Sequence, residues 1–203
     1  MYFNKKNDSF TFKFVRYYDI KNLFDVISKY DDEWLENTSR QDISKLHEGV
    51  HVLTQSCRIY MNPLDWSIGD EYAAHFVCKD PELWKHVEPI ILDLEKIYSG
   101  KVGRATIVKL PPNSLVFPHE DPYVYPNVIH RIHVPIITND SVFFSVYDST
   151  KNLLAGEAWE VNNAKLHGCY NIGNTDRVHL IVDIIPGSLI GTNKVLDENT
   201  NQH

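Results

Sequence analysis

The stretch from residue 103 to residue 185 constrains the fold most, because it breaks into short runs rich in β-branched and aromatic residues. Turn signals such as Pro111-Pro112-Asn113 and Gly156 separate the runs, which recur at intervals of roughly ten residues. The runs are RATIVKL, SLVFPH, IHRIHVPII, SVFFSVY, EAWEVN, KLHGCYNI and DRVHLIVDII. Seven short strands at this spacing predict a mainly β domain of the sandwich or small-barrel class.

The first hundred residues carry two helical patterns. Residues 20–35 place apolar side chains at helical spacing directly after Asp19, whose carboxylate can accept the unpaired amides of a first turn. Residues 80–98 predict the best helix, with Asp80 at the N-cap and a stop at Gly100. We expect both helices to cover one face of the β region.

Two further strands are predicted at residues 10–18 and 51–61, and no linker separates any of these elements from the β-rich stretch. We therefore expect a single domain over residues 1–203. Residues 1–100 would form a supporting region of helices and strands, and residues 101–186 the β core. The polar end of the chain, residues 187–203, is expected to be a flexible tail.

Charge and cysteine content exclude several classes of protein. The net charge of -7, with no basic run, argues against nucleic acid or an anionic membrane as the main partner. The three cysteines show no CxxC spacing, which is typical of a reducing compartment and not of a disulfide scaffold. No apolar run is long enough for a membrane span, and the start lacks a signal peptide, so we expect a cytoplasmic protein.

His119 and Asp121 form the most informative polar motif, because side chains two apart on an extended segment point the same way. With His167 they would supply two imidazoles and one carboxylate, a set that holds ferrous iron on one face and leaves the other open. If the loop after Asn171 joins a hairpin, residue 167 faces residue 179. His167, Arg177 and His179 would then share one face of a sheet.

Each of these residues also has an ordinary structural interpretation. A His-x-Asp pair occurs often by chance on protein surfaces. Arg177 could be a strand-surface residue paired with Asp176 or Glu157, and Arg131 could pair with Glu160 or Asp183. His130 and His179 are expected to be core or strand-surface residues and not metal ligands.

From Ile107 to Asp183 the chain resembles the aspartyl/asparaginyl β-hydroxylase family of iron(II)- and 2-oxoglutarate-dependent oxygenases. The matching segments are LPPNSLVFPHED, RIHVPIITN, GEAWEVNN and LHGCYNIGNTDRVHLIVD, with weaker upstream likeness at Trp34, Arg40-Gln41 and HVLTQS. The founding members keep only two histidine ligands. Because Asp121 stands where a full triad has its acid, the chain is more similar to the free-proline hydroxylase branch.

The resemblance implies a double-stranded β-helix, or jelly roll, of cupin-like form with flanking N-terminal helices. It assigns His119, Asp121 and His167 to iron(II), and Arg177 to the distal carboxylate of 2-oxoglutarate. It also places Arg131 and His133 beside this co-substrate. Dioxygen would be the third participant in the reaction.

Substrate-contacting residues are harder to predict, and the candidates are Tyr123 and Tyr125 in the loop after the metal motif, Trp159, and Arg40. The expected substrate is an amino acid, free and proline-like or within a peptide. Its hydroxylation would accompany decarboxylation of 2-oxoglutarate to succinate. Two alternatives stay open: a non-catalytic cupin-like module that binds a small ligand, and a metal enzyme that does not use 2-oxoglutarate. The oligomeric state is not predicted.

Overall fold

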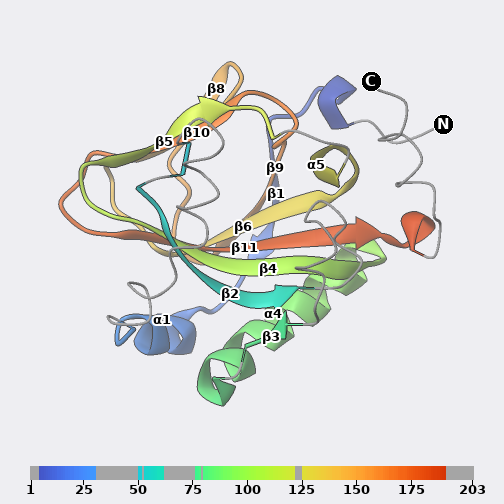
Figure 1. Ribbon diagram of the computed structural model, residues 1–203, viewed down its shortest axis with the longest axis horizontal. Coiled ribbons are helices and arrows are strands. Elements are labelled where there is room, and N and C mark those ends of the chain that lie inside the picture. The colour runs from blue at the N-terminus through green and yellow to red at the C-terminus, as the bar shows by residue number, and fades with distance from the viewer. Residues whose placement is uncertain are drawn as a thin grey trace.

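Two antiparallel β-sheets face each other in the computed structural model, which describes residues 5–30, 50–51, 53–61, 76–78, 80–121 and 125–190 (Figure 1). The larger sheet has seven strands in the order β1-β9-β6-β11-β4-β2-β3, and the smaller has four in the order β5-β10-β7-β8. This is the jelly roll expected from the sequence, and the fold-class prediction is confirmed. Each of the seven predicted runs contains a strand.

The strands of the larger sheet are β1 (Phe12–Tyr17), β2 (Gln55–Met61), β3 (Phe76–Val77), β4 (Gly100–Leu110), β6 (His130–Ile137), β9 (Glu157–Val161) and β11 (Arg177–Pro186). Those of the smaller sheet are β5 (Ser114–His119), β7 (Val142–Val146), β8 (Ser149–Lys151) and β10 (His167–Asn171). The helices are α1 (Lys21–Ile27), α4 (Pro81–Tyr98) and α5 (Tyr125–Val128), with 3-10 turns η1 (Lys5–Asn7) and η3 (Gly187–Leu189). Among the described residues, no helix combines the length and apolar character needed to cross a membrane.

Helices α1 and α4 pack on the outer face of the larger sheet, as predicted (Figure 1). Leu83, Val87 and Leu94 of α4 are fully buried against this face, together with Leu180 and Val182 of β11. Each such side chain contributes roughly 1.5–3 kcal/mol by leaving water. This apolar layer fixes the outer face of β11, so the alternate residues of that strand must point into the space between the sheets.

Local signals account for both ends of α4. The Asp80 carboxylate accepts the amide protons of Glu82 at 2.9 Å and Leu83 at 3.3 Å, and Pro81 occupies the first turn. The helix closes at Ser99, which adopts a left-handed φ of 49°. Gly100, the predicted stop, is instead the first residue of β4.

Helix α1 ends at Ile27 and is therefore shorter than the predicted span of residues 20–35. Asp19 accepts the amide proton of Lys21 at 3.1 Å, but the N-cap position is occupied by Ile20, one residue later than predicted. The remainder of the predicted span, from residue 31 onward, lies outside the described residues, as does the tail from residue 191.

The predicted hairpin between residues 167 and 179 is wrong. Strand β10 pairs with β5 and β7, whereas β11 pairs with β4 and β6 in the other sheet. The loop after Asn171 therefore crosses from one sheet to the other, as the connections of a jelly roll do. His167 and Arg177 consequently lie on opposite walls of the barrel and not side by side on one sheet.

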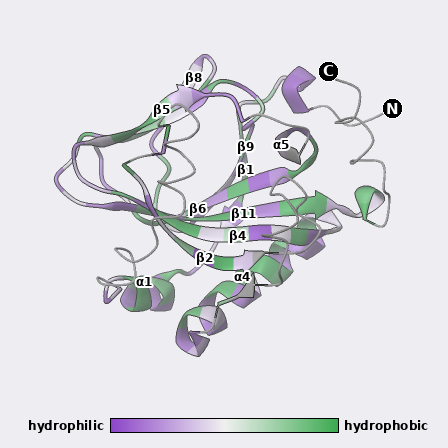
Figure 2. Ribbon diagram, viewed as in Figure 1, coloured by the Kyte–Doolittle hydropathy of each residue, from purple (hydrophilic) through white to green (hydrophobic). Residues whose placement is uncertain are grey.

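The space between the sheets contains both apolar and polar side chains. The apolar part is a second core cluster that includes Val142, Phe144, Leu153 and Cys169. Figure 2 shows hydrophilic segments within β4 and β6, near the middle of the larger sheet. Such residues on the inner face of a sheet need partners or a ligand, because burial without hydrogen bonds is costly.

Replacing Asp80 with alanine should lower the free energy of unfolding by about 1 kcal/mol, because two amides at the start of α4 lose their acceptor. Urea denaturation measures the change. Asp80→Asn is the matched control, since asparagine caps a helix nearly as well and should retain most of the stability. Equal stability of the wild type and the alanine variant would show that this cap contributes nothing.

Candidate metal centre

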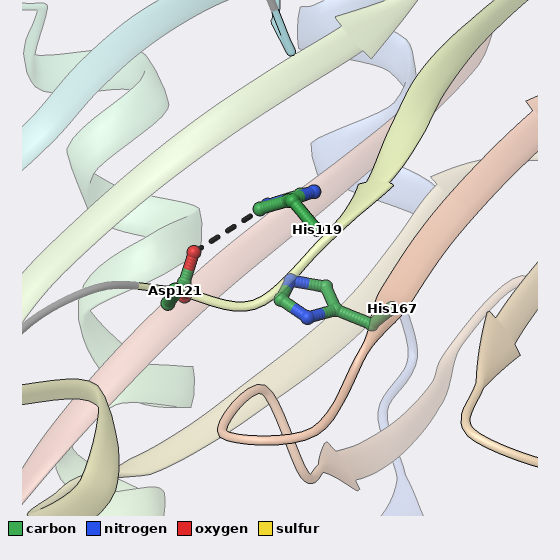
Figure 3. A group of neighbouring side chains, drawn as sticks. All are labelled: His119, Asp121 and His167. Carbon is green, nitrogen blue, oxygen red and sulfur yellow. Dashed lines mark ion pairs between the residues drawn. The ribbon is translucent and has the colours of Figure 1, made fainter. Parts of the chain in front are cut away.

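The pairing of β5 with β10 brings the predicted metal-binding residues together (Figure 3). His119 ends β5, His167 begins β10, and the two are direct register partners with ring centroids 4.3 Å apart. Asp121 follows two residues after His119, and its Oδ1 lies 3.4 Å from His119 Nε2. One potential ligand atom from each of the three residues lies within 4.8 Å of the others.

Backbone carbonyls orient both imidazoles. His119 Nδ1 lies 2.7 Å from the carbonyl oxygen of Phe117, and His167 Nδ1 lies 2.9 Å from that of Lys165. A carbonyl oxygen can only accept, so each Nδ1 carries a proton. In the neutral form of each ring, Nε2 is then the nitrogen that presents a lone pair to a metal. Burial lowers the pKa of His167 to about 4, which keeps this imidazole neutral and available for a metal at neutral pH.

Asp121 is held as a carboxylate by two neighbours. It forms a close ion pair with Arg131 Nη1, and Asn163 Nδ2 donates to its Oδ2 at 3.0 Å. Burial alone would raise the pKa of Asp121. The charge of Arg131 outweighs this effect and holds the pKa of Asp121 well below its usual range.

An ion-pair chain continues from Asp121 into the larger sheet. Arg131 on β6 donates to Asp183 through Nε at 2.8 Å and Nη2 at 2.9 Å, and Arg104 on β4 reaches the same carboxylate at 2.8 Å. Asp183 is fully buried on β11. Although burial acts in the opposite direction, Arg131 and Arg104 lower its pKa to about 2. These contacts connect Asp121 to the three central strands β6, β11 and β4.

Two residues that support the position of Asp121, Lys5 and Asn163, are not predicted from the sequence. Lys5 is fully buried and donates to the Val161 carbonyl at 2.8 Å and to Asn163 Oδ1 at 3.2 Å, which leaves the Asn163 amide group facing Asp121. Asn163 lies in the GEAWEVNN segment and could have been suspected there. Nothing in the sequence around Lys5 indicates that it is buried.

A glycine permits the close approach of β10 and β5 at this site. A Cβ on Gly168 would meet the Val116 carbonyl oxygen at 3.0 Å and the backbone nitrogen of Pro118 at 3.2 Å. Both contacts are with backbone, so a side chain at this position would push β5 away. That displacement would move His119 relative to His167.

The three residues predicted to bind the co-substrate all lie in the barrel but have different surroundings. Arg131 belongs to the ion-pair chain. His133 is buried on β6 and Arg177 on β11, 4% and 2% exposed respectively. No described carboxylate lies within ion-pair distance of Arg177, and its Nε has no hydrogen-bond partner among the described residues. Arg177 is therefore not a strand-surface arginine paired with Asp176 or Glu157, which was the structural alternative.

One aromatic ring links the metal motif to this buried arginine. The Phe144 ring is stacked with that of His167 at 6.5 Å between centroids, and the Arg177 guanidinium carbon lies 5.8 Å from the Phe144 centroid. His133 contacts the same ring edge-on at 5.0 Å. The two imidazoles and the guanidinium thus surround Phe144.

The predicted substrate residues are less informative. Trp159 is half-buried on β9, where its Nε1 donates to Glu157 at 2.8 Å and its ring packs on Phe14. Tyr125 begins α5, and its side chain lies outside the described part of the structure. Tyr123 and Arg40 also lie outside the described residues.

Comparison with protein families matches residues 71–186 to the aspartyl/asparaginyl beta-hydroxylase model, which is more than half of the chain. The chain belongs to the aspartyl/asparaginyl beta-hydroxylase family. No curated protein matches it. The family resemblance seen in the sequence is therefore confirmed.

Solved structures share the fold of this hydroxylase-family chain at low sequence identity. The collagen prolyl hydroxylase of Paramecium bursaria Chlorella virus-1, in a 2-oxoglutarate complex, is 7% identical with a TM-score of 0.54 over 88% of this chain and 97% of that one. A prolyl-4-hydroxylase of Pseudomonas putida is 8% identical, with a TM-score of 0.53 over 88% and 94%. A 2-oxoglutarate-iron(II) oxygenase family protein of Burkholderia pseudomallei is 12% identical, with a TM-score of 0.50 over 65% and 67%.

The donor set suits a divalent transition metal. Two imidazoles and an ionised carboxylate form the facial ligand set used by ferrous oxygenases, and Asp121 is already ionised without a metal. Both imidazole tautomers direct Nε2 away from their carbonyl partners. The residues present therefore fit the metal that the family implies.

Asp183 should make stability depend on pH at the acid end. Its folded pKa of about 2 lies below the ordinary value of 3.8, so its contribution is full above pH 4 and is lost as the pH falls towards 2. Asp183→Asn should lower the free energy of unfolding at pH 6 by about 3–5 kcal/mol, because the buried carboxylate that holds two partly buried arginines loses its charge. Its stability should also fall less steeply between pH 4 and pH 2.

Urea denaturation at a series of pH values tests this prediction. Glu82→Gln is the control, because Glu82 pairs with Lys85 on the exposed surface of α4 and such pairs contribute at most about 1 kcal/mol. Parallel pH profiles of the wild type and Asp183→Asn would contradict the assigned role.

Proposed function

We propose that this protein is an iron(II)- and 2-oxoglutarate-dependent dioxygenase that hydroxylates an amino acid, free or within a peptide. The observation that carries the proposal is a three-residue metal motif in the same barrel as a buried arginine with no described carboxylate partner. The first feature suits an iron centre, and the second suits an anionic co-substrate. Family membership supports both parts.

Iron, 2-oxoglutarate and dioxygen, when bound, supply oxidative decarboxylation to succinate and carbon dioxide coupled to hydroxylation of a C–H bond. His119, Asp121 and His167 would hold the metal by one face, which leaves the opposite positions open. The hydrogen bonds to Phe117, Lys165 and Asn163 hold these ligands in place before any metal arrives. Such preorganisation is what the protein contributes, because the cofactors carry the difficult chemistry.

Arg177 would bind the distal carboxylate of 2-oxoglutarate. Its guanidinium is buried, and its Nε lacks a described partner, so an incoming carboxylate can neutralise the charge and accept a hydrogen bond from this nitrogen. The Phe144 ring lies near both Arg177 and His167 and would line the co-substrate site. Because Arg177 is a buried cation with no described carboxylate partner, we favour this assignment over a metal enzyme that does not use a diacid.

Arg131 would act on the metal motif and not on the co-substrate. Its guanidinium contacts Asp121 and binds Asp183 through two nitrogens. We infer that it aims the carboxylate of Asp121 at the metal and keeps it ionised. His133 is left as the second candidate for the co-substrate, since it is buried beside Phe144.

The substrate would approach the open face of the metal from the mouth of the barrel. Tyr123, Tyr125, Trp159 and Arg40 remain candidates for this role. Two proteins of the same fold are prolyl hydroxylases, which makes proline and prolyl peptides the first compounds to test. The decisive experiment is a succinate-release assay with fresh ferrous iron, 2-oxoglutarate and oxygen, against free amino acids and then peptides. No succinate with any of them would overturn the proposal.

Replacing His167 and Arg177 should separate metal binding from co-substrate binding. His167→Ala should abolish tight metal binding, because one of three ligands is lost. Arg177→Met should leave metal binding nearly unchanged and raise the 2-oxoglutarate requirement by about 100-fold, since a buried charged contact is worth roughly 2–5 kcal/mol. Calorimetry with manganese and then with 2-oxoglutarate measures both constants. Equal loss of metal binding in the two variants would contradict these separate roles.

A further inference from the structure

His179 stands next to Arg177 on the inner face of β11 and is only 1% exposed. The sequence predicts a core or strand-surface residue at this position. Its surroundings differ from those of a packed core histidine. Arg177 Nη2 lies 2.7 Å from His179 Nδ1, and His133 Nδ1 lies 3.4 Å from the same atom.

The contact with Arg177 determines which nitrogen of His179 carries the proton. A guanidinium can only donate, so His179 Nδ1 must be the acceptor of the 2.7 Å hydrogen bond. Burial, together with the charges of Arg177 and His133, holds the pKa of His179 well below its usual range, and the ring is therefore neutral. A neutral imidazole that accepts at Nδ1 carries its one proton on Nε2.

That Nε2 proton has no acceptor among the described residues, and neither has the proton on Arg177 Nε. Two buried donors without partners therefore sit on side chains joined by one hydrogen bond. Leaving them unpaired costs roughly 1–3 kcal/mol each, more where the group is charged. An anion within reach of both donors would satisfy them together.

We infer that His179 is a second donor to the distal carboxylate of the 2-oxo acid, acting with Arg177 to select a dicarboxylic co-substrate. This inference rests on the proposed function. The carboxylate would accept from Arg177 Nε and from His179 Nε2, one oxygen for each donor. Arg177 contributes the charge, and His179 contributes a neutral donor at a second fixed position. A 2-oxo monoacid would leave both donors unpaired and would therefore bind poorly.

Two substitutions distinguish a direct donor from a residue that only positions Arg177. In His179→Asn the amide oxygen can replace Nδ1 as the acceptor for Arg177, but no atom reaches the place of Nε2. In His179→Gln the amide nitrogen can replace the Nε2 donor, but the Nδ1 acceptor is lost. A direct donor predicts that the glutamine variant retains affinity and the asparagine variant does not.

The experiment is anaerobic calorimetry of the manganese-loaded protein with 2-oxoglutarate and, separately, with 2-oxopentanoate, which has no distal carboxylate. His179→Asn should weaken 2-oxoglutarate binding about tenfold to hundredfold, the range of one hydrogen bond to a charged group. Its affinity for 2-oxopentanoate and for manganese should not change. Val178→Ala is the matched control, because Val178 faces the opposite, apolar side of the same strand.

The possible results distinguish a failure of the donor role of His179 from a failure of the proposed function. Tight 2-oxoglutarate binding by His179→Asn, or loss in His179→Gln with retention in His179→Asn, would overturn the donor role while the proposed function stands. Equal weakening of both 2-oxo acids in His179→Asn would also overturn it, because the effect would not involve the distal carboxylate. A wild-type protein that binds manganese but not 2-oxoglutarate would overturn the proposed function itself.

Discussion

The site depends on the register between β5 and β10. Side chains alternate between the faces of a strand, so a slip by one residue would turn His119 or His167 out of the barrel. The register is supported by the close backbone approach at Gly168, where a Cβ would lie only 3.0 Å from the Val116 carbonyl oxygen of β5. A bulge next to His167 then lets the two histidines meet as direct partners, although the strands are out of step further along.

The buried charges between the sheets fall into two groups, one paired within the protein and the other suited to an added ligand. The carboxylates of Asp121 and Asp183 are matched by Arg131 and Arg104, so this group is complete without any small molecule. Arg177 lies in the same interior without a described carboxylate partner. Burying a cation in this way is costly, and the simplest compensation is an anion that binds there.

Sequence patterns predicted the strands and helix α4 well, because alternation, turns and the Asp80 cap are local signals. The predicted pairing of β10 with β11 is wrong, and it shows that local signals do not determine which strands pair. A short loop after Asn171 is compatible with a hairpin, and only the packing of two sheets decides that it crosses between them. Lys5 illustrates the same limit, since its burial depends on carbonyls and carboxylates more than a hundred residues away.

The error in pairing also changes the meaning of the site. A hairpin would place Arg177 beside His167 on one sheet, where both could reach the same ligand atom. In the jelly roll they belong to opposite sheets, with Phe144 in contact with each. A ligand that joins them needs a metal-binding group at one end and an anionic group at the other, separated by a short apolar chain. 2-Oxoglutarate has this form, whereas an acid with a single carboxylate could satisfy only one wall of the barrel.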